Sequence, residues 1–193
     1  PGTGFRWEDY PWQGAIVHFT RLLGSVNTGD NQSAEAELAA LRAARDKLLR
    51  QKDAYKANQV QIQILASEAW MQFKAERTAE RLTQMTLAAE MEEKTAKHPV
   101  TPCEVLPARE LLGDLLFQLN EPAKAFIAYE TSLKKNANRF NSLYGAALAA
   151  ERSGRKEKAR YYYAKLVGQA EPASDRQELA VARKYLKSEL AFE

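Results

Sequence analysis

The sequence has 193 residues, of which 45% are hydrophobic and 27% are charged, and its formal net charge is +3. This composition is that of a folded, water-soluble protein and argues against wholesale disorder. No apolar run approaches the roughly 20 residues that a membrane-spanning helix needs. A net charge this small does not predict the extended basic surface that nucleic-acid binding requires. We therefore expect a soluble protein with neither a membrane nor a nucleic-acid partner.

The N-terminus, PGTGFRWEDYPW, lacks the basic and then apolar segments of a signal peptide. Because it opens on Pro-Gly without Met, we expect a piece trimmed from a longer protein, so the compartment, cytoplasmic or exported, stays open. Residues 1–14 predict an aromatic arm, with Phe5, Trp7, Tyr10 and Trp12. We expect this arm to cover the open face of the first helical hairpin, and recognition of a partner is the alternative interpretation.

Four segments have the pattern of helical hairpins, because small and apolar residues recur at three- and four-residue steps on both sides of a helix-breaking turn. They span residues 15–48, 57–97, 106–139 and 140–173. Asn120 is predicted to be the N-cap of the helix that starts at Pro122. After the last hairpin, Ser174 and Gln177 have capping-box spacing, which predicts an amphipathic capping helix over residues 174–191.

The third and fourth hairpins repeat each other at a constant offset, which is the separation between Ala125 and Ala159. At this offset, Tyr129 aligns with Tyr163. In the first helices, Leu112, Gly113 and Leu116 align with Ala146, Ala147 and Ala150. Small side chains let two helices cross closely, so we expect the helix crossings at Gly113, Ala125, Ala147 and Ala159.

A helical hairpin that repeats at this offset, with Leu-Gly early, Ala after the turn and an aromatic residue four positions later, resembles the tetratricopeptide repeat (TPR) family. The family's early Trp is replaced by Arg109 and Leu143, and its closing Pro by Ala137 and Glu171. The resemblance implies an all-α fold. It also implies one domain over residues 15–193, built as a right-handed α-solenoid of about four TPR-like hairpins plus the capping helix.

The resemblance implies a scaffold for protein–protein interaction, which holds a peptide or protein partner in a concave groove lined by the first helix of each hairpin. The family's groove positions correspond to Gln61, Ile64, Glu68, Met71, Glu110, Asp114, Phe117, Asn141, Tyr144 and Glu151. Glu110 and Asp114 stand where carboxylate-binding TPR domains carry Lys and Asn. We therefore expect a basic or mixed peptide rather than an acidic tail.

The sequence contains no Gly-rich phosphate loop and no HExxH, GxSxG or CxxC motif. We therefore expect no enzyme activity, no cofactor and no bound metal. His98 and Cys103 are interpreted as an isolated pair on a surface loop rather than as a base and nucleophile. The acidic run Glu90, Glu92 and Glu93 is interpreted as a solvated helix end.

Two other functions stay open. The chain could be the C-terminal module of a larger, exported protein. In that case the module would serve in oligomerisation or docking, and the protein could form a homo-oligomer. The basic stretch from Arg152 to Lys165 contains three tyrosines, and cations with aromatic rings can bind nucleic acid. We favour the structural interpretation of this stretch, which places Ala159 and Tyr163 in the core of the hairpin.

Overall fold

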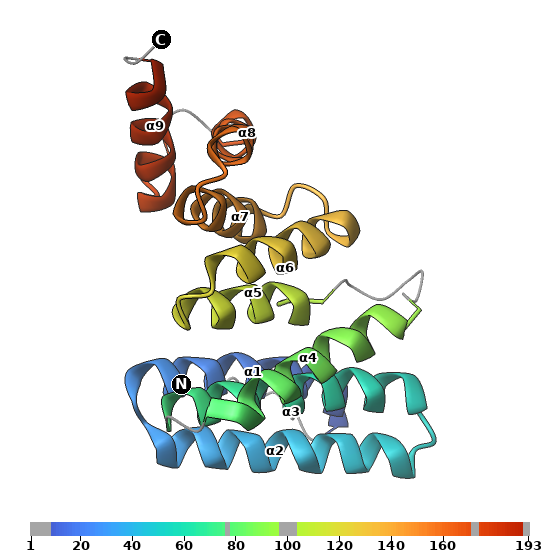
Figure 1. Ribbon diagram of the computed structural model, residues 1–193. Coiled ribbons are helices and arrows are strands. Elements are labelled where there is room, and N and C mark those ends of the chain that lie inside the picture. The colour runs from blue at the N-terminus through green and yellow to red at the C-terminus, as the bar shows by residue number, and fades with distance from the viewer. Residues whose placement is uncertain (1–8, 76–77, 97–103, 171–173, 191–193) are drawn as a thin grey trace. The chain divides into compact units, whose positions relative to one another are not determined.

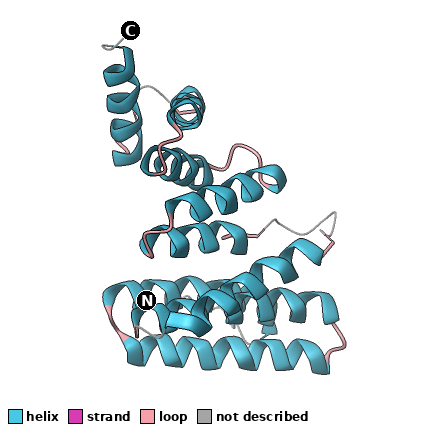
Figure 2. Cartoon of the chain, viewed as in Figure 1, coloured by secondary structure: helices cyan, strands magenta, loops and turns pink. Residues whose placement is uncertain are grey.

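The computed structural model describes residues 9–75, 78–96, 104–170 and 174–190. All regular secondary structure in these residues is helical (Figures 1 and 2). The helices are α1 (Pro11–Thr28), α2 (Asn31–Arg50), α3 (Ala54–Lys74), α4 (Thr78–Lys94), α5 (Ala108–Gln118), α6 (Pro122–Lys135), α7 (Phe140–Arg152), α8 (Lys156–Gly168) and α9 (Gln177–Leu190). The predicted all-α class is confirmed, and each predicted hairpin corresponds to two helices.

The chain folds into two compact units, Pro1–Ala108 and Arg109–Glu193, called unit 1 and unit 2 below. In unit 1, α1 packs against α2 and α3, α2 packs against α3, and α3 packs against α4. In unit 2, α6 packs against α7, α7 against α8, and α8 against α9. In all of these pairs except α1 with α3, the two helices follow one another along the chain, as short connections favour.

The first helix begins earlier than the sequence pattern indicates. Residues 11–14, at the end of the predicted aromatic arm, form the first turn of α1. Pro11 is tolerated there because its missing N–H would have no intrahelical partner. Tyr10 precedes this helix and is 48% exposed. Phe5 and Trp7 lie outside the described residues.

Four helix ends share one turn geometry, in which a residue just after the helix adopts a left-handed conformation. The φ angles are 79° at Gly29, 60° at Lys52, 58° at Asn120 and 75° at Gly154. The next N–H then donates back to a carbonyl near the end of the helix, which satisfies an acceptor that the helix leaves free. Asn120 and Gly154 are separated by the same offset as Ala125 and Ala159, so the sequence repeat extends to the backbone.

Asn120 ends α5 and does not cap α6. Its N–H donates to the carbonyl of Phe117 (3.1 Å). The N-cap of α6 is Glu121, whose side chain makes no capping hydrogen bond. The predicted N-cap role of Asn120 is therefore wrong. Asn is among the few residue types that accept the left-handed conformation, and the turn uses it for that purpose.

Two aspartates cap helices of unit 1. The side chain of Asp30 accepts a hydrogen bond from the Ser33 N–H at 3.0 Å, and hydrogen bonding by Ser33 lowers the pKa of the carboxyl. Asp53 accepts from the N–H and the ammonium group of Lys56, at 3.1 and 2.7 Å, with the same effect on its pKa. Such caps stabilise a helix start by about 1 kcal/mol.

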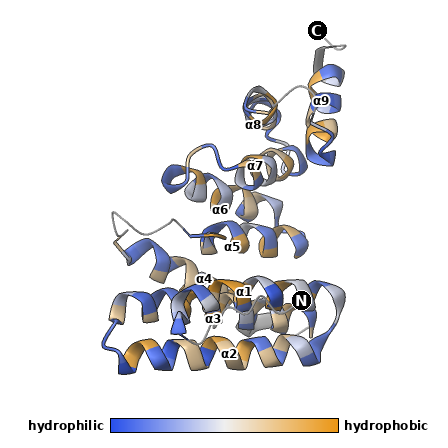
Figure 3. Cartoon of the chain, turned by 180° about the vertical axis from the view of Figure 1, so that it is seen from behind, coloured by the Kyte–Doolittle hydropathy of each residue, from blue (hydrophilic) through white to orange (hydrophobic). Residues whose placement is uncertain are grey.

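The helices are amphipathic, and Figure 3 shows polar and apolar residues on the same helices. The largest buried side chains of unit 1 include Phe19, Leu22, Leu41, Ile64 and Met85, and those of unit 2 include Leu115, Leu143, Tyr163, Leu166 and Leu179. Ala125 and Ala159 are fully buried, as the predicted helix crossings require. None of the helices in the described parts of the chain is long and apolar enough to cross a lipid bilayer.

Tyr129 fills a gap that two glycines leave. A Cβ atom added to Gly113 on α5 would lie 2.7 Å from the Tyr129 ring, and one added to Gly145 on α7 would lie closer still. The close approach predicted at Gly113 is confirmed. Gly145 was not expected from the sequence, because its counterpart in the third hairpin at the repeat offset is Leu111.

Candidate functional site

A groove of about 510 Å³ lies among α2, α3 and α4 of unit 1. Its lining consists of Asn31, Glu35, Leu38, Arg42, Glu68, Met71, Gln72, Lys74, Ala75 and Gln84. Two of these residues, Glu68 and Met71, were predicted as groove positions from the sequence. A volume of this size falls in the range of ligand sites in proteins, which is about 300–1,000 Å³.

Helical spacing explains why these residues share one surface. The α2 residues Asn31, Glu35, Leu38 and Arg42 follow one another at steps of three and four, so they lie on one face of that helix. At the end of α3, Gln72 lies four positions after Glu68, and Ala75, the residue that follows the helix, lies four positions after Met71, so these residues also share a face. The sequence prediction missed the α2 residues because it assigned the groove to the first helix of each hairpin, whereas α2 is a second helix. Their spacing was the signal that could have found them.

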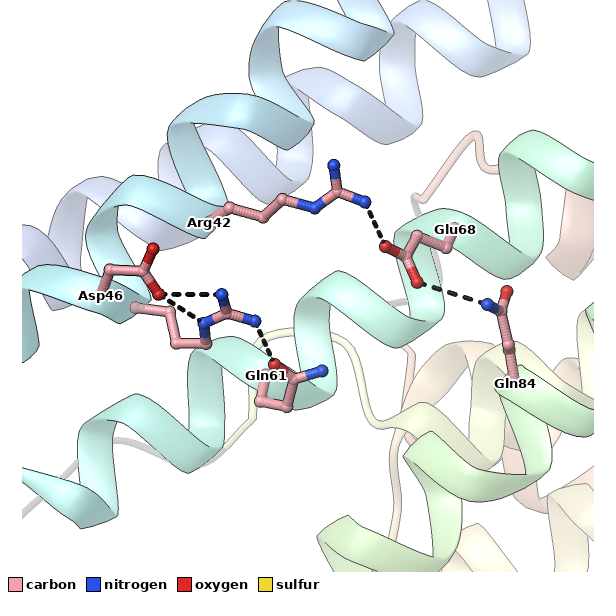
Figure 4. Close-up of polar contacts among 6 residues, drawn as sticks. Arg42, Asp46, Gln61, Glu68 and Gln84 are labelled. Carbon is pink, nitrogen blue, oxygen red and sulfur yellow. Dashed lines mark hydrogen bonds and ion pairs between the residues drawn. The ribbon is translucent and has the colours of Figure 1, made fainter. Parts of the chain in front are cut away.

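Polar contacts tie the three helices together beside this groove (Figure 4). The guanidinium of Arg42 on α2 donates to Glu68 on α3 at 2.6 Å. The amide nitrogen of Gln84 on α4 donates to the other carboxylate oxygen of Glu68 at 3.3 Å. The side chain of Arg42 is 52% exposed and that of Glu68 is 20% exposed. An ion pair this accessible to water contributes only about 0–1 kcal/mol to stability.

Some polar groups of the lining have no partner among the described residues. The carboxamide oxygens of Gln72 and Gln84 are buried and accept no hydrogen bond there. A buried acceptor without a donor costs about 1–3 kcal/mol. Both oxygens are closed to solvent, so a ligand that brings hydrogen-bond donors can satisfy them only after the Gln side chains turn toward the groove.

The two other predicted groove residues of unit 1 have structural roles. Gln61 accepts a hydrogen bond from Arg45 at 2.7 Å, and Arg45 also bonds Asp46 (Figure 4). Ile64 is 2% exposed. It belongs to the core because its position on α3 faces inward, so it is not available to a ligand.

In unit 2, Glu110 is enclosed rather than presented to a partner. Its side chain is 2% exposed and accepts hydrogen bonds from the Arg139 guanidinium, at 2.8 Å, and from the Ser142 hydroxyl. The Ser142 hydroxyl also lies 3.2 Å from that of Ser132. Glu110 therefore joins α5 to the start of α7, and its predicted place in a groove is not the one observed.

Asp114 is likewise occupied by its own unit. The Tyr129 hydroxyl donates to it at 2.6 Å. Burial raises the pKa of Asp114 to about 6 in spite of this hydrogen bond, and the nearby charge of Glu110 raises it further. The repulsion that we expected Glu110 and Asp114 to exert on an acidic tail loses its basis, since neither carboxylate is free on a binding surface.

The remaining predicted residues of unit 2 lie on α5 and α7. Phe117 packs under the Arg152 guanidinium, 4.8 Å from its ring centre. Asn141 and Glu151 are exposed and Tyr144 is half-buried, and all three share one side of α7. Glu151 accepts a hydrogen bond from the Tyr163 hydroxyl at 2.8 Å.

The tyrosine-rich stretch of α8 is mostly structural. Tyr163 and Ala159 are fully buried, as the structural interpretation of this stretch predicted. The Tyr162 hydroxyl donates to Glu130 at 2.8 Å, and burial raises its pKa. Only Tyr161 of the three is exposed, at 55%. A stacking platform for several bases is therefore missing from this helix.

The acidic run of α4 is not uniformly solvated. Glu92 is 6% exposed and accepts a hydrogen bond from the Ala108 N–H at 2.9 Å. The interpretation as a solvated helix end is therefore wrong for this residue. Within the described ranges, no three His, Cys, Asp or Glu side chains are grouped as metal ligands would be. His98 and Cys103 lie outside those ranges.

Comparison with known proteins adds no family to this description. No protein-family model matches the sequence, and no curated protein matches it either.

Proposed function

We propose that this chain is a non-catalytic scaffold that holds a peptide segment of a protein partner in the unit 1 groove. The observation that carries this proposal is the groove itself, which combines a volume of about 510 Å³ with unpaired carboxamide oxygens. Peptides offer main-chain N–H groups to such acceptors and side chains to apolar residues such as Leu38 and Met71. The residues of unit 2 that the sequence analysis assigned to a groove do not line this one.

The groove is built on helices, which favours binding. Its residues come from three helices that pack against one another in pairs, α2 with α3 and α3 with α4. A surface held by packed helices loses little conformational freedom when a ligand binds, so more of the contact energy appears as affinity.

We infer further that the hairpins are TPR-type repeats of a right-handed α-solenoid. Two observations support this inference. The turns at Asn120 and Gly154, one repeat offset apart, have the same backbone geometry, and α1 packs against α3, the first helix of the next hairpin. Deletion of residues 140–173 should leave a protein that unfolds cooperatively with reduced stability, because repeat proteins tolerate the loss of a whole repeat. Loss of cooperative unfolding in circular dichroism would count against the inference.

Peptide selection tests the proposed function. A random peptide library displayed on phage is selected against the immobilised protein, and the selected peptides are measured by fluorescence anisotropy. Met71→Glu places a charge on the apolar part of the groove and should weaken binding at least tenfold. Ile127→Glu is the matched control, because Ile127 is 59% exposed on α6 of unit 2. Equal affinities for both variants, or a library that yields no binding peptide, would refute the proposal.

A further inference from the structure

We propose that the unit 1 groove recognises a basic side chain, the guanidinium of Arg or the ammonium of Lys, in the bound peptide. This inference rests on the proposed function and names the chemistry that the groove selects. It replaces the sequence-based expectation of a basic partner, which was drawn from Glu110 and Asp114 and has lost its basis in unit 2.

The buried polar atoms of the groove that lack partners are both acceptors. They are the carboxamide oxygens of Gln72 and Gln84. Guanidinium and ammonium groups carry several N–H donors and no acceptor, so once the Gln side chains turn toward the groove they can satisfy these oxygens without bringing an unpaired acceptor of their own. A hydrogen bond from a charged donor is also about twice as strong as one from a neutral donor.

The depth of the charges favours a cation, although the formal charges of the lining cancel. The anion Glu68 is 20% exposed, whereas its partner Arg42 is 52% exposed. Lys74 is also exposed, so water screens its ammonium group. Glu35, on the same face of α2 as Arg42, is exposed as well, and neither Glu35 nor Lys74 forms an ion pair with a residue that the structure describes, so these two screened charges offset each other. Arg42 bonds only one oxygen of Glu68, and the other accepts a hydrogen bond from the neutral Gln84 amide at 3.3 Å, so this second oxygen is where a ligand cation can meet the Glu68 charge.

The apolar part of the groove suits the stem of such a side chain. Leu38 is 8% exposed, and Met71 is partly exposed beside it in the lining. Lys and Arg cover apolar surface with their methylene chains while the charged end makes polar contacts. Methionine adapts to ligands of different shape, because its side chain is unbranched and flexible.

Methionine methyl groups report on this proposal directly. The chain has three methionines, Met71 in the groove, Met85 in the core of unit 1 and Met91 on α4. Protein labelled with ¹³C-methyl methionine is titrated with blocked pentapeptides that differ only in the central residue: arginine, lysine, citrulline, norleucine or glutamate. Met71→Leu assigns the groove signal, and Met85 serves as the internal reference.

We expect the arginine and lysine peptides to shift the Met71 signal with affinities about tenfold higher than those of the citrulline and norleucine peptides. The glutamate peptide should produce the smallest shift. If all peptides shift the Met71 signal equally, the inference fails and the proposed function survives. If no peptide shifts it, the inference fails and the groove loses its proposed function as well.

A charge variant provides the second measurement. Glu35→Gln removes an exposed carboxylate of the groove and should weaken binding of the arginine peptide about fivefold, with no effect on the norleucine peptide. Glu157→Gln, at an exposed position of α8 in unit 2, is the matched control and should bind the arginine peptide like the parent protein. An unchanged affinity in Glu35→Gln would contradict the proposed role of the anionic lining.

Discussion

Each unit contains an Arg–Glu ion pair, but one pair is enclosed by the protein and the other is accessible to water. In unit 2, Arg139 bonds Glu110 at 2.8 Å, and the carboxylate is 2% exposed. In unit 1, Arg42 bonds Glu68 at 2.6 Å, but the two side chains are 52% and 20% exposed. The distances are similar, so burial is what distinguishes them. An enclosed pair is part of the fold, whereas an accessible pair can exchange partners with a ligand.

The largest effect should follow from breaking the enclosed pair. Arg139→Met leaves the Glu110 carboxylate buried with only the Ser142 hydroxyl as a described partner, and we expect a loss of about 3–5 kcal/mol in the free energy of unfolding. Urea denaturation followed by circular dichroism measures it. Arg42→Met is the matched control in unit 1 and should change stability by less than about 1 kcal/mol. Equal losses in both variants would erase the distinction between the pairs.

The packing around Tyr129 provides the next test, which asks how tightly the core of unit 2 is packed. Gly145→Ala pushes a methyl group into the Tyr129 ring, which is 3% exposed and tied to Asp114, and should cost about 1–3 kcal/mol. The control is Gly24→Ala on α1, where an added Cβ meets nothing within 4 Å. That change should be neutral or stabilise unit 1 by about 0.5–1 kcal/mol. A stable Gly145→Ala protein would show that the Tyr129 ring can move.

The pKa of Asp114 predicts a pH dependence of stability. Its folded-state pKa of about 6 lies above the ordinary value of 3.8, so the folded state binds this proton more tightly than the unfolded state. The contribution of this group therefore rises as pH falls from about 7 to about 4, by about 1–3 kcal/mol.

Asp114→Asn keeps an acceptor for Tyr129 and removes the titration, so it should flatten this dependence and stabilise the protein at pH 7. Thermal midpoints at pH 7.5 and pH 5 check both expectations. Asp175→Asn, at an exposed position, serves as the control. The same pH response in the Asp114→Asn variant and in the parent protein would assign the effect to another group.

The smallest expected effect concerns peptide binding beside the accessible ion pair of unit 1. Arg42→Met removes the charged partner of Glu68 and leaves the neutral Gln84 amide, so the carboxylate becomes available to a basic ligand. The affinity for the arginine pentapeptide should then increase about threefold, a change of about 0.6 kcal/mol. Isothermal titration calorimetry measures it. Weaker binding would mean that Arg42 itself contacts the peptide.

The helices and their turns could be predicted from the sequence because their signals are local. Small and apolar residues at helical steps mark the helices, and Gly29, Asn120 and Gly154 mark their ends. The constant repeat offset reinforced those signals, since a turn in one hairpin predicts the turn in the next. The exact role of Asn120 needed the structure, because Asn suits both a helix start and a left-handed turn.

Burial of polar residues could not be predicted in the same way. Glu110 was assigned to a binding groove because it stands at a position that corresponds to the groove of the TPR family. Its partner Arg139 lies far along the chain, just before α7 begins, and no helical spacing links the two. Glu68 and Met71, which the sequence interpretation placed in a groove, line the groove of unit 1. The unpaired oxygens of Gln72 and Gln84 depend on how three helices pack, which no pattern along the chain records.

The wedge of Tyr129 between two glycines also has a consequence for sequence divergence. A ring at position 129 requires that positions 113 and 145 carry no side chain. A smaller residue in place of the ring would remove this requirement on both helices at once. In homologous chains, these three positions should therefore change together, and a chain with a bulkier residue at 113 or 145 should lack an aromatic ring at 129.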